Sequence, residues 1–453
     1  MNANRTLTIV LTAVIAYVPA SSFGQSDEQS KRTAVKNAAL LETLEKNVAP
    51  PPIEPVIGRY EKVVVRKGES LFDIARAHNV SLAALRRVNG LKSDRVKPGK
   101  SLLLPSLHVL PRNPGDGIVL NVPERALYVI RQGAVEARYP VAVGQSTWQT
   151  ALGEFRLRKK LKNPPWKPTK EMVEREGISD EIVPPGPKNP LGDRWMGWSA
   201  PGFGFHSTIA PRSIGTAASH GCVRLYPEAA HALFDQVAVG MPIYSVYEPV
   251  LVGTLNGRFY LTVFPDIYHT GLASPARVGK ELEAAGIADL VDAKTVQTIV
   301  RHADGYPHRI IGSDEPLTVN GTEIRSTVAP TRVKGQWVVP AREVAAALGG
   351  QVTVHNGSVV IQGGGRTLTL KPAEKSADID GQRVTLEIAP TVLKGVTVAP
   401  LGILTEALGA RVAWEKGKGV EVTSVSAGDV EHAGRRAEEG RPRVKTTGTG
   451  GGI

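Results

Sequence analysis

The hydrophobic pattern between residues 60 and 105 is that of a small unit with both helices and strands. Apolar runs at 63–65 and 102–104 each have the length of a short strand, and two helix-like patterns lie between them. Ser70 and Ser81 stand directly before these two patterns, where a hydroxyl side chain can accept hydrogen bonds from the first free N–H groups of a helix. We therefore expect a βααβ module.

Alternating apolar and polar positions predict a β-sheet-rich domain in the next segment, residues 116–249. The alternation is clearest at 118–122 and 126–130, two stretches that a turn separates. Residues 163–198 interrupt the pattern with several Pro and Trp residues, and we expect a long ordered loop there. Such loops in compact domains are often functional lids, and simple packing of the Trp side chains is the alternative.

The remaining patterned sequence falls into two segments. Residues 250–312 contain a hairpin signal at Asn256-Gly257 and two helical patterns, which predict an extension of mixed structure without a readable function. Residues 315–425 contain an internal repeat with an offset of 60 residues. Each copy predicts strands and one amphipathic helix that follows a Pro, at 341–348 and at 401–408, so two copies of one α+β unit are expected.

The first 24 residues predict a secretory signal peptide. Arg5 precedes an apolar run at 7–18, and small residues follow up to an expected cleavage site near Gly24. The run is shorter than the roughly 20 residues that a membrane-spanning helix needs. We therefore expect an exported protein, in the cell wall or periplasm, with no integral membrane segment after cleavage.

Two segments lack the pattern of a packed core. Residues 25–59 predict a linker, with an amphipathic stretch around 33–44 and a Pro run at 50–52. Residues 426–453 are polar, charged and rich in Gly, which is typical of a disordered tail. The predicted fold class is therefore multidomain and mainly β, with α+β modules.

The length of the chain is consistent with several domains, and its charge distinguishes only weakly among classes of binding partner. The chain has 453 residues, whereas domains usually have roughly 100–200. An excess of 55 Lys and Arg over 43 Asp and Glu gives a net charge of +12, which favours contact with polyanions without choosing among nucleic acid, anionic lipid and wall polymers. The Gly run at 363–365 lacks the strand-to-helix context of a phosphate-binding loop. We expect no nucleic acid partner.

The chain has a single cysteine, Cys222, which is a candidate for chemistry. An exported chain with one Cys cannot form an internal disulfide, so its thiol needs another explanation. A buried apolar role is the ordinary one, but His206, His220, Gly221 and Arg224 surround this Cys in the sequence. Cysteine nucleophiles need a proton partner, positive potential and N–H donors for an oxyanion, and all these ingredients occur within this one stretch.

The stretch from His206 to Arg224 resembles the signature of the L,D-transpeptidases of the YkuD and ErfK type, which pairs an upstream His with Ser/Thr-His-Gly-Cys and a nearby Arg or Asn. The resemblance implies that Cys222 is the nucleophile and His206 its proton donor and acceptor. It further implies that the Ser207 carbonyl orients the imidazole. Many relatives have Gly where this chain has Ser207, but a carbonyl role tolerates that change.

The remaining roles follow from the same resemblance. The backbone of His220, Gly221 and Cys222 would supply oxyanion donors, and Arg224 and Ser219 would contact the substrate. The implied reaction is attack of the thiolate on a tetrapeptide stem of peptidoglycan, release of D-Ala, and transfer of the acyl group to an amine in cell-wall cross-linking. Water as acceptor would instead give L,D-carboxypeptidase activity. No cofactor and no metal are expected.

Two further resemblances concern the flanking modules. Residues 60–105 are similar to LysM domains, which implies binding to glycan strands of peptidoglycan and makes peptidoglycan the expected partner. Residues 315–425 resemble the copper amine oxidase N-terminal-like domain, for which we expect a structural or adhesive role, since His355 alone could not make a copper site. The residues that carry the resemblance of 60–105 to LysM domains are Lys67-Gly68-Glu69-Ser70-Leu71, Ile74-Ala75, Leu85, Asn89-Gly90 and Lys97-Pro98-Gly99.

Three alternatives remain open at this point. His206, His220 and Cys222 could be three zinc ligands, although no further Cys or His pattern supports a metal site. A domain without activity could serve as a non-enzymatic peptidoglycan-binding scaffold. A general cysteine peptidase is the third alternative, and the local spacing of Cys and His disfavours it.

Overall fold

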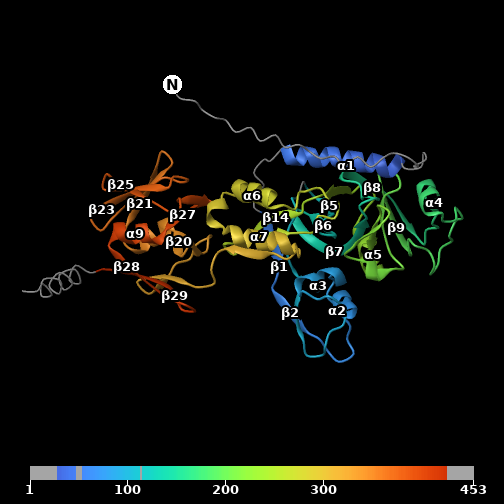
Figure 1. The fold of residues 1–453 in the computed structure, drawn as a ribbon, viewed down its shortest axis with the longest axis horizontal. Helices are drawn as coiled ribbons and strands as arrows, with labels where there is room; N and C mark the ends of the chain where they lie inside the picture. Colours follow the sequence, from blue (N-terminus) through green and yellow to red (C-terminus); the bar gives the residue numbers. More distant parts are fainter. Residues whose placement is uncertain (1–27, 47–53, 113–114, 426–453) are drawn as a thin grey trace, which may run out of the picture.

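The computed structural model describes residues 28–46, 54–112 and 115–425. The expected signal peptide (1–24) and tail (426–453) lie outside these residues. The molecule is elongated, with the domain of residues 315–425 at one end and the domain of residues 116–249 at the other (Figure 1). We call residues 315–425 the repeat domain and residues 116–249, which carry the central sheet of the site, the central domain. Residues 250–312 lie between them, and residues 60–105, the N-terminal module, project to one side.

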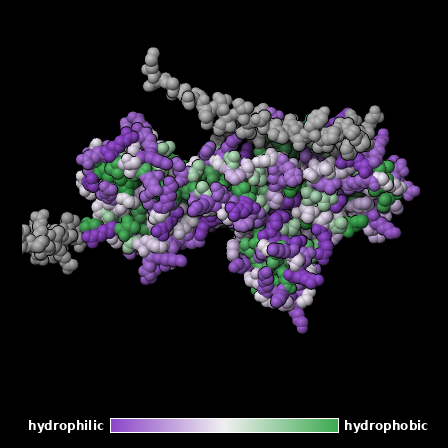
Figure 2. All heavy atoms as spheres, in the orientation of Figure 1, coloured by the Kyte–Doolittle hydropathy of each residue, from purple (hydrophilic) through white to green (hydrophobic). Residues whose placement is uncertain are grey.

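The prediction of a multidomain, mainly β chain is confirmed, because most elements are strands and they gather into six separate sheets in the described part of the chain. Within the same residues, no helix combines the length and the apolar character that crossing a membrane would require. Figure 2 shows that hydrophilic side chains cover most of one face, with smaller hydrophobic patches over the repeat domain and the N-terminal module.

The N-terminal module has the expected order of strand, helix, helix and strand, formed by β2 (Glu61–Val64), α2 (Leu71–Ala77), α3 (Leu82–Val88) and β3 (Ser101–Leu104). Both predicted caps are present: the Ser70 side chain accepts from the N–H of Asp73, and the Ser81 side chain from the N–H of Ala84. The core is formed by fully buried side chains of the two helices and of β3, namely Leu71, Ile74, Leu85 and Leu102.

This module is inserted into a β-hairpin. Strand β1 (Glu54–Gly58) enters the module and β4 (Leu107–Val109) leaves it, and the two pair antiparallel with Gly58 opposite Leu107. The other edge of β1 pairs parallel with β14 (Val250–Leu255). The chain therefore leaves this sheet and returns to it at almost the same point.

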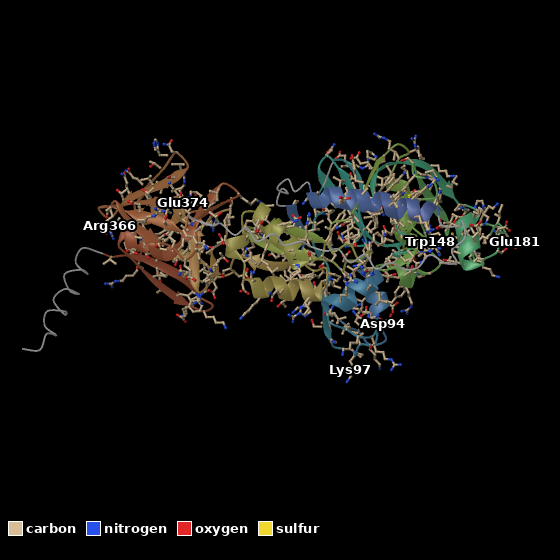
Figure 3. All side chains as sticks on the ribbon, turned by 45° about the horizontal axis from the view of Figure 1, so that its top comes forward. Asp94, Lys97, Trp148, Glu181, Arg366 and Glu374 are labelled. Carbon is tan, nitrogen blue, oxygen red and sulfur yellow. The ribbon has the colours of Figure 1, made fainter. Side chains whose placement is uncertain are left out.

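The module also packs against the central domain. The guanidinium of Arg76 binds both carboxylate oxygens of Glu228, at 3.1 and 2.8 Å. The Asn79 amide donates to the carbonyl of Arg138 at 2.7 Å. A Cβ at Gly215 would lie 2.3 Å from the Ser81 side chain, so the Gly215 backbone packs directly against this side chain. Figure 3 shows Lys97 at the free end of the module.

The central domain is a nine-stranded sheet that closes on itself. Its strand order is β11-β7-β12-β10-β9-β8-β13-β5-β6, and the long strand β7 pairs with both β6 and β12. Buried apolar side chains from the sheet and from α5 (Pro227–Gln236) form one core. The strands are β5 (Gly117–Asn121), β6 (Ala126–Arg131), β7 (Ala134–Gly144), β8 (Gly153–Lys162), β9 (Arg194–Trp198), β10 (Gly204–His206), β11 (Ala217–Ser219), β12 (Val223–Leu225) and β13 (Pro242–Val246).

Residues 25–59, expected to be a linker, contain two ordered elements. Helix α1 (Glu28–Lys46) lies along the central domain, and β1 belongs to the sheet described above (Figure 1). Leu40 and Leu41 of α1 pack against the core of the central domain. The amphipathic pattern around 33–44 thus has a folded partner, which a sequence pattern alone does not reveal.

The extension joins the central domain to the repeat domain. Its strands β14, β15 (Arg258–Val263) and β16 (His308–Ile311) continue the sheet of β1 and β4, and the predicted Asn256-Gly257 hairpin connects the first two. Both turn residues have positive φ, 50° and 74°. The helical elements of the extension are α6 (Pro275–Ala284), η2 (Ala288–Leu290) and α7 (Ala293–His302).

The repeat domain contains the two expected copies. Helices α8 (Ala341–Ala347) and α9 (Leu401–Leu408) each follow a Pro, as predicted, and the matched turn residues Asn320 and Asp380 both have positive φ, 49° and 53°. The strands are β17 (Leu317–Val319), β18 (Thr322–Glu323), β19 (Thr331–Val333), β20 (Gln336–Pro340), β21 (Gln351–His355), β22 (Ser358–Gly363), β23 (Arg366–Leu370), β24 (Ser376–Ile379), β25 (Gln382–Thr385), β26 (Thr391–Leu393), β27 (Val396–Pro400), β28 (Ala410–Glu415) and β29 (Gly419–Ser424).

Candidate active site

Two neighbouring strands of the central sheet bring His206 and Cys222 to one cavity. Strands β10 and β12 are parallel neighbours, with Phe205 opposite Val223. His206 is the last residue of β10, and Cys222 directly precedes β12. Both side chains line a cavity of about 460 Å³, which Ser219, His220 and Arg224 also line.

The imidazole of His206 is held in its neutral form. Its side chain is buried, and Nδ1 lies 2.6 Å from the carbonyl oxygen of Ser207. A carbonyl only accepts hydrogen bonds, so Nδ1 carries the proton and Nε2 is the basic nitrogen of the neutral ring. Burial, together with the nearby charge of Arg224, lowers the pKa of His206 to about 4, although the carbonyls of Ser207 and Leu191 act in the opposite direction.

Cys222 is held as a thiol. Its Sγ donates a hydrogen bond to the carbonyl of Gly202 at 3.1 Å. Burial raises the pKa of the thiol to about 11, while the backbone of Gly204 and the charge of Arg224 lower it. Thiol and imidazole are therefore both neutral in the resting site near pH 7.

The loop that carries Cys222 has a tightly defined backbone. Gly221 has φ of +101°, a conformation that L side chains rarely adopt, and a Cβ there would lie 2.9 Å from the Phe203 ring. The hydroxyl of Ser219 donates to the carbonyl of Cys222 itself. The side chain of Ser219, expected to contact substrate, therefore also shapes the loop.

Arg224 places a positive charge at the cavity. Within the part of the chain that the structure describes, its guanidinium has no hydrogen bond or ion pair with a protein group. Burial lowers its pKa, but an arginine keeps its proton at neutral pH. The cavity thus offers a cation to a carboxylate of a bound molecule.

The loop of residues 163–198 covers this cavity and is fastened to the Cys222 loop. It contains α4 (Lys170–Glu176), and Oε1 of Glu176 lies 2.6 Å from Nε2 of His220. The other edge of the His220 ring meets Trp148, with ring centroids 5.0 Å apart. No pattern in the sequence pointed to Glu176, because it lies 44 residues from its partner. We call this loop of residues 163–198 the lid. Its apolar residues around the cavity include Pro164, Trp166, Met172 and Ile178.

His206, His220 and Cys222 line one cavity, but among the described residues they do not form a group that could hold a metal ion. Across residues 28–46, 54–112 and 115–425, no three His, Cys, Asp or Glu side chains lie close enough together to hold a metal ion. Nε2 of His220 faces Glu176, whereas Nδ1 of His206 faces the carbonyl of Ser207. The geometry therefore offers no ligand set for zinc.

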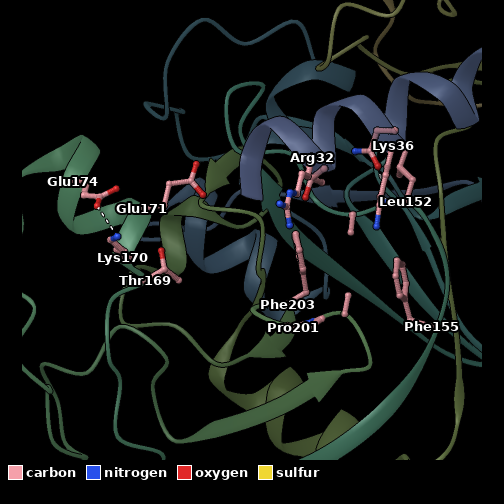
Figure 4. A pocket seen from close by; sticks show the side chains of 14 residues that line it. Arg32, Lys36, Leu152, Phe155, Thr169, Lys170, Glu171, Glu174, Pro201 and Phe203 are labelled. Carbon is pink, nitrogen blue, oxygen red and sulfur yellow. Dashed lines mark hydrogen bonds and ion pairs between the residues drawn. The ribbon is translucent and has the colours of Figure 1, made fainter. Parts of the chain in front are cut away.

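A second cavity, of about 560 Å³, lies on the other side of the loop that contains Gly202. Figure 4 shows Arg32 and Lys36 of α1 on one wall and Pro201 and Phe203 facing them. The Phe203 ring also abuts Gly221, so this wall is shared with the Cys222 loop.

The structure thus brings together all seven residues expected at the site, which are Cys222, His206, Ser207, His220, Gly221, Arg224 and Ser219. It adds three buried polar residues that the sequence did not single out: Asn37, Thr150 and Tyr268. These contact the Cys222 loop, or residues next to it, through side-chain hydrogen bonds between distant segments.

Three family models match separate parts of the chain. The L,D-transpeptidase catalytic domain matches residues 115–245, the LysM domain residues 63–105 and the copper amine oxidase N-terminal domain residues 318–422.

Similar proteins carry the same family name. The probable L,D-transpeptidase YcfS of Escherichia coli K12 is 32% identical, with 57% of this chain and 86% of that protein covered. The probable L,D-transpeptidase YbiS of the same strain is 28% identical, with 55% and 82% covered. The NMR structure of the catalytic domain of an E. faecium L,D-transpeptidase is 20% identical, covers 30% of this chain and 100% of its own, and has a TM-score of 0.25. The chain belongs to the L,D-transpeptidase family, the transpeptidase enzymes of peptidoglycan metabolism.

Proposed function

We propose that this enzyme forms an acyl-enzyme on Cys222 with a tetrapeptide stem of peptidoglycan and passes the acyl group to an amine. The observation that carries the proposal is the shared cavity of Cys222 and His206, in which the Ser207 carbonyl fixes the imidazole tautomer. A nucleophile and a base that line one cavity are what covalent acyl transfer requires.

In the first half-reaction, Sγ of Cys222 attacks the carbonyl carbon of the third stem residue. Its proton passes to Nε2 of His206, and the carbonyl oxygen becomes an oxyanion that backbone N–H groups of His220, Gly221 and Cys222 stabilise. The tetrahedral intermediate then collapses. The C–N bond to the terminal D-Ala breaks, its nitrogen takes the proton back from His206, and a thioester remains on Cys222.

In the second half-reaction, an amine of another stem attacks the thioester carbonyl. His206 accepts the amine proton, and the C–S bond breaks as this proton returns to the sulfur of Cys222. The product is a cross-link between two stems. Water in place of the amine gives L,D-carboxypeptidase activity by the same steps.

The charge of the cavity suits a stem peptide. Arg224 stands free of protein partners among the described residues, and Lys159 and Lys167 also line the cavity. Carboxylates of the stem would bind these cations, so we assign Arg224, and with it Ser219, to substrate binding. No step of this reaction needs a cofactor.

The flanking modules are consistent with an enzyme that acts on intact peptidoglycan. The LysM module and the catalytic domain both indicate binding to peptidoglycan, in the cell wall or periplasm. We propose that residues 1–24 direct export and that the LysM module holds glycan strands, which raises the local concentration of stem peptides at Cys222.

Replacing the nucleophile tests the covalent step. The mature protein, incubated with a disaccharide-tetrapeptide, should gain the mass of the acyl group on Cys222 and release D-Ala. Cys222→Ala should show neither, because the thioester cannot form. Intact-protein and product mass spectrometry measures both, and the products separate cross-linking from hydrolysis. Absence of adduct and of turnover in the folded wild-type protein, with a reduced thiol and with several stem peptides, would favour the non-enzymatic scaffold instead.

The pH dependence of thiol alkylation tests the neutral resting pair. Because the pKa of Cys222 is raised to about 11, the thiol form dominates at lower pH. The rate of iodoacetamide alkylation should therefore rise about tenfold per pH unit between pH 6 and 9, as the thiolate fraction does. A rate that is flat across this range would show a preformed thiolate–imidazolium pair and contradict the neutral assignment.

Excision of the LysM module tests its proposed role. Gly58 and Leu107 face each other across a hairpin, so a short Asn-Gly turn can replace residues 59–106. This variant should lose activity on intact sacculi while it retains activity on soluble muropeptides, because only sacculi offer long glycan strands. Product analysis on the two substrates measures this, with Arg76→Ala as a control that keeps the module but weakens its docking. Equal losses on both substrates would argue against a glycan-holding role.

A further inference from the structure

Thr150 occupies the centre of a buried hydrogen-bond network behind the Cys222 loop. Its side chain is fully buried, and its hydroxyl donates to the carbonyl of Gly221 at 2.9 Å. The same hydroxyl accepts a hydrogen bond from the N–H of Gly144 at 2.9 Å. The hydroxyl therefore acts both as a donor and as an acceptor, and these two hydrogen bonds fix its orientation.

The bond to the Gly221 carbonyl determines where the next N–H group points. Peptide bonds in the described chain are all trans, so the C=O of Gly221 and the N–H of Cys222, which belong to one peptide unit, point in opposite directions. With the carbonyl held by Thr150, the Cys222 N–H points away from Thr150. Gly221 has φ of +101°, and without such a bond this peptide unit could rotate.

Two segments from outside the matched catalytic domain hold Thr150 in place. From α1, the buried Asn37 side chain donates to the carbonyl of Thr150 at 3.1 Å and to the side chain of Gln149 at 2.9 Å, and it accepts from the N–H of Leu152 at 3.0 Å. The side-chain amide thus satisfies backbone groups on both sides of residue 151, as a neighbouring strand would.

From the extension, the hydroxyl of Tyr268 accepts from the N–H of Thr150 at 2.8 Å and donates to the carbonyl of Gly144 at 3.1 Å. The Tyr268 ring stacks on Tyr247, with centroids 5.3 Å apart, and the N–H of Tyr268 donates to the Tyr247 hydroxyl. Gly144 and Thr150 are the two ends of the turn that carries Trp148, whose ring contacts His220.

We propose that Asn37 and Tyr268 are positioning residues that act through Thr150 to aim the Cys222 N–H at the oxyanion. The catalytic unit of this chain then includes α1 and the start of the extension, beyond residues 115–245 that match the catalytic family model. The inference rests on the proposed role of Cys222 as nucleophile.

The test compares two reactions of the same thiol. Acylation by a tetrapeptide passes through an oxyanion, whereas alkylation by iodoacetamide is a displacement at carbon without one. Thr150→Val and Tyr268→Phe should each lower kcat for D-Ala release by about 10- to 100-fold, because the oxyanion donor is misaimed. KM and the rate of alkylation should stay unchanged. Thr150→Ser, which restores the hydroxyl, should recover most of kcat.

Matched controls separate positioning from general loss of stability. Tyr306 is buried to a similar extent as Tyr268, and its hydroxyl has no hydrogen-bond partner among the described residues, so Tyr306→Phe should leave kcat unchanged. On α1, Asn37→Leu should lower kcat, and Val35→Ala, at an exposed position, should not. Circular dichroism melting establishes that each variant is folded at the assay temperature.

The outcomes distinguish the two proposals. If wild-type protein forms no acyl adduct, the proposed nucleophile fails, and the positioning role fails with it. If wild-type protein is acylated and folded Thr150→Val and Tyr268→Phe are acylated equally fast, only the positioning role is overturned. A parallel fall in acylation and alkylation would also overturn it, because the thiol and not the oxyanion donor would then have changed.

Discussion

The parallel pairing of β10 and β12 is the constraint on which the rest of the site depends. One strand ends at His206 and the other begins after Cys222, so backbone hydrogen bonds set the separation of the imidazole and the thiol before any side chain is placed. The closed sheet leaves neither strand a free edge along which it could slip. The lid and the Cys222 loop then build a cavity on this rigid base.

Burial gives the pair its resting state. It raises the pKa of the thiol and lowers that of the imidazole, so both groups stay neutral near pH 7. Arg224 remains the positive centre of the site. Because the thiolate is the reactive form of a cysteine, a thiol kept neutral limits side reactions of Cys222.

Local signals account for the parts that the sequence predicted. The caps at Ser70 and Ser81 join residues three apart, and the Asn256-Gly257 turn is a two-residue feature, so short windows of sequence contain them. Asn37 differs, because its partners lie 112 to 115 residues away. The amphipathic pattern of its helix was visible, but the surface that receives the helix forms only when the central sheet has closed.

The hairpin insertion of the LysM module has a geometric consequence. The module is attached through both strands of the β1–β4 hairpin and through the Arg76–Glu228 contact. Its orientation relative to the central domain is therefore held at several points, unlike that of a module on a single flexible linker. A peptidoglycan strand bound to a module fixed in this way would keep a set direction relative to the cavity of Cys222. If the module holds glycan as proposed, the enzyme would reach only those stems that stand at one spacing and one angle along the polymer.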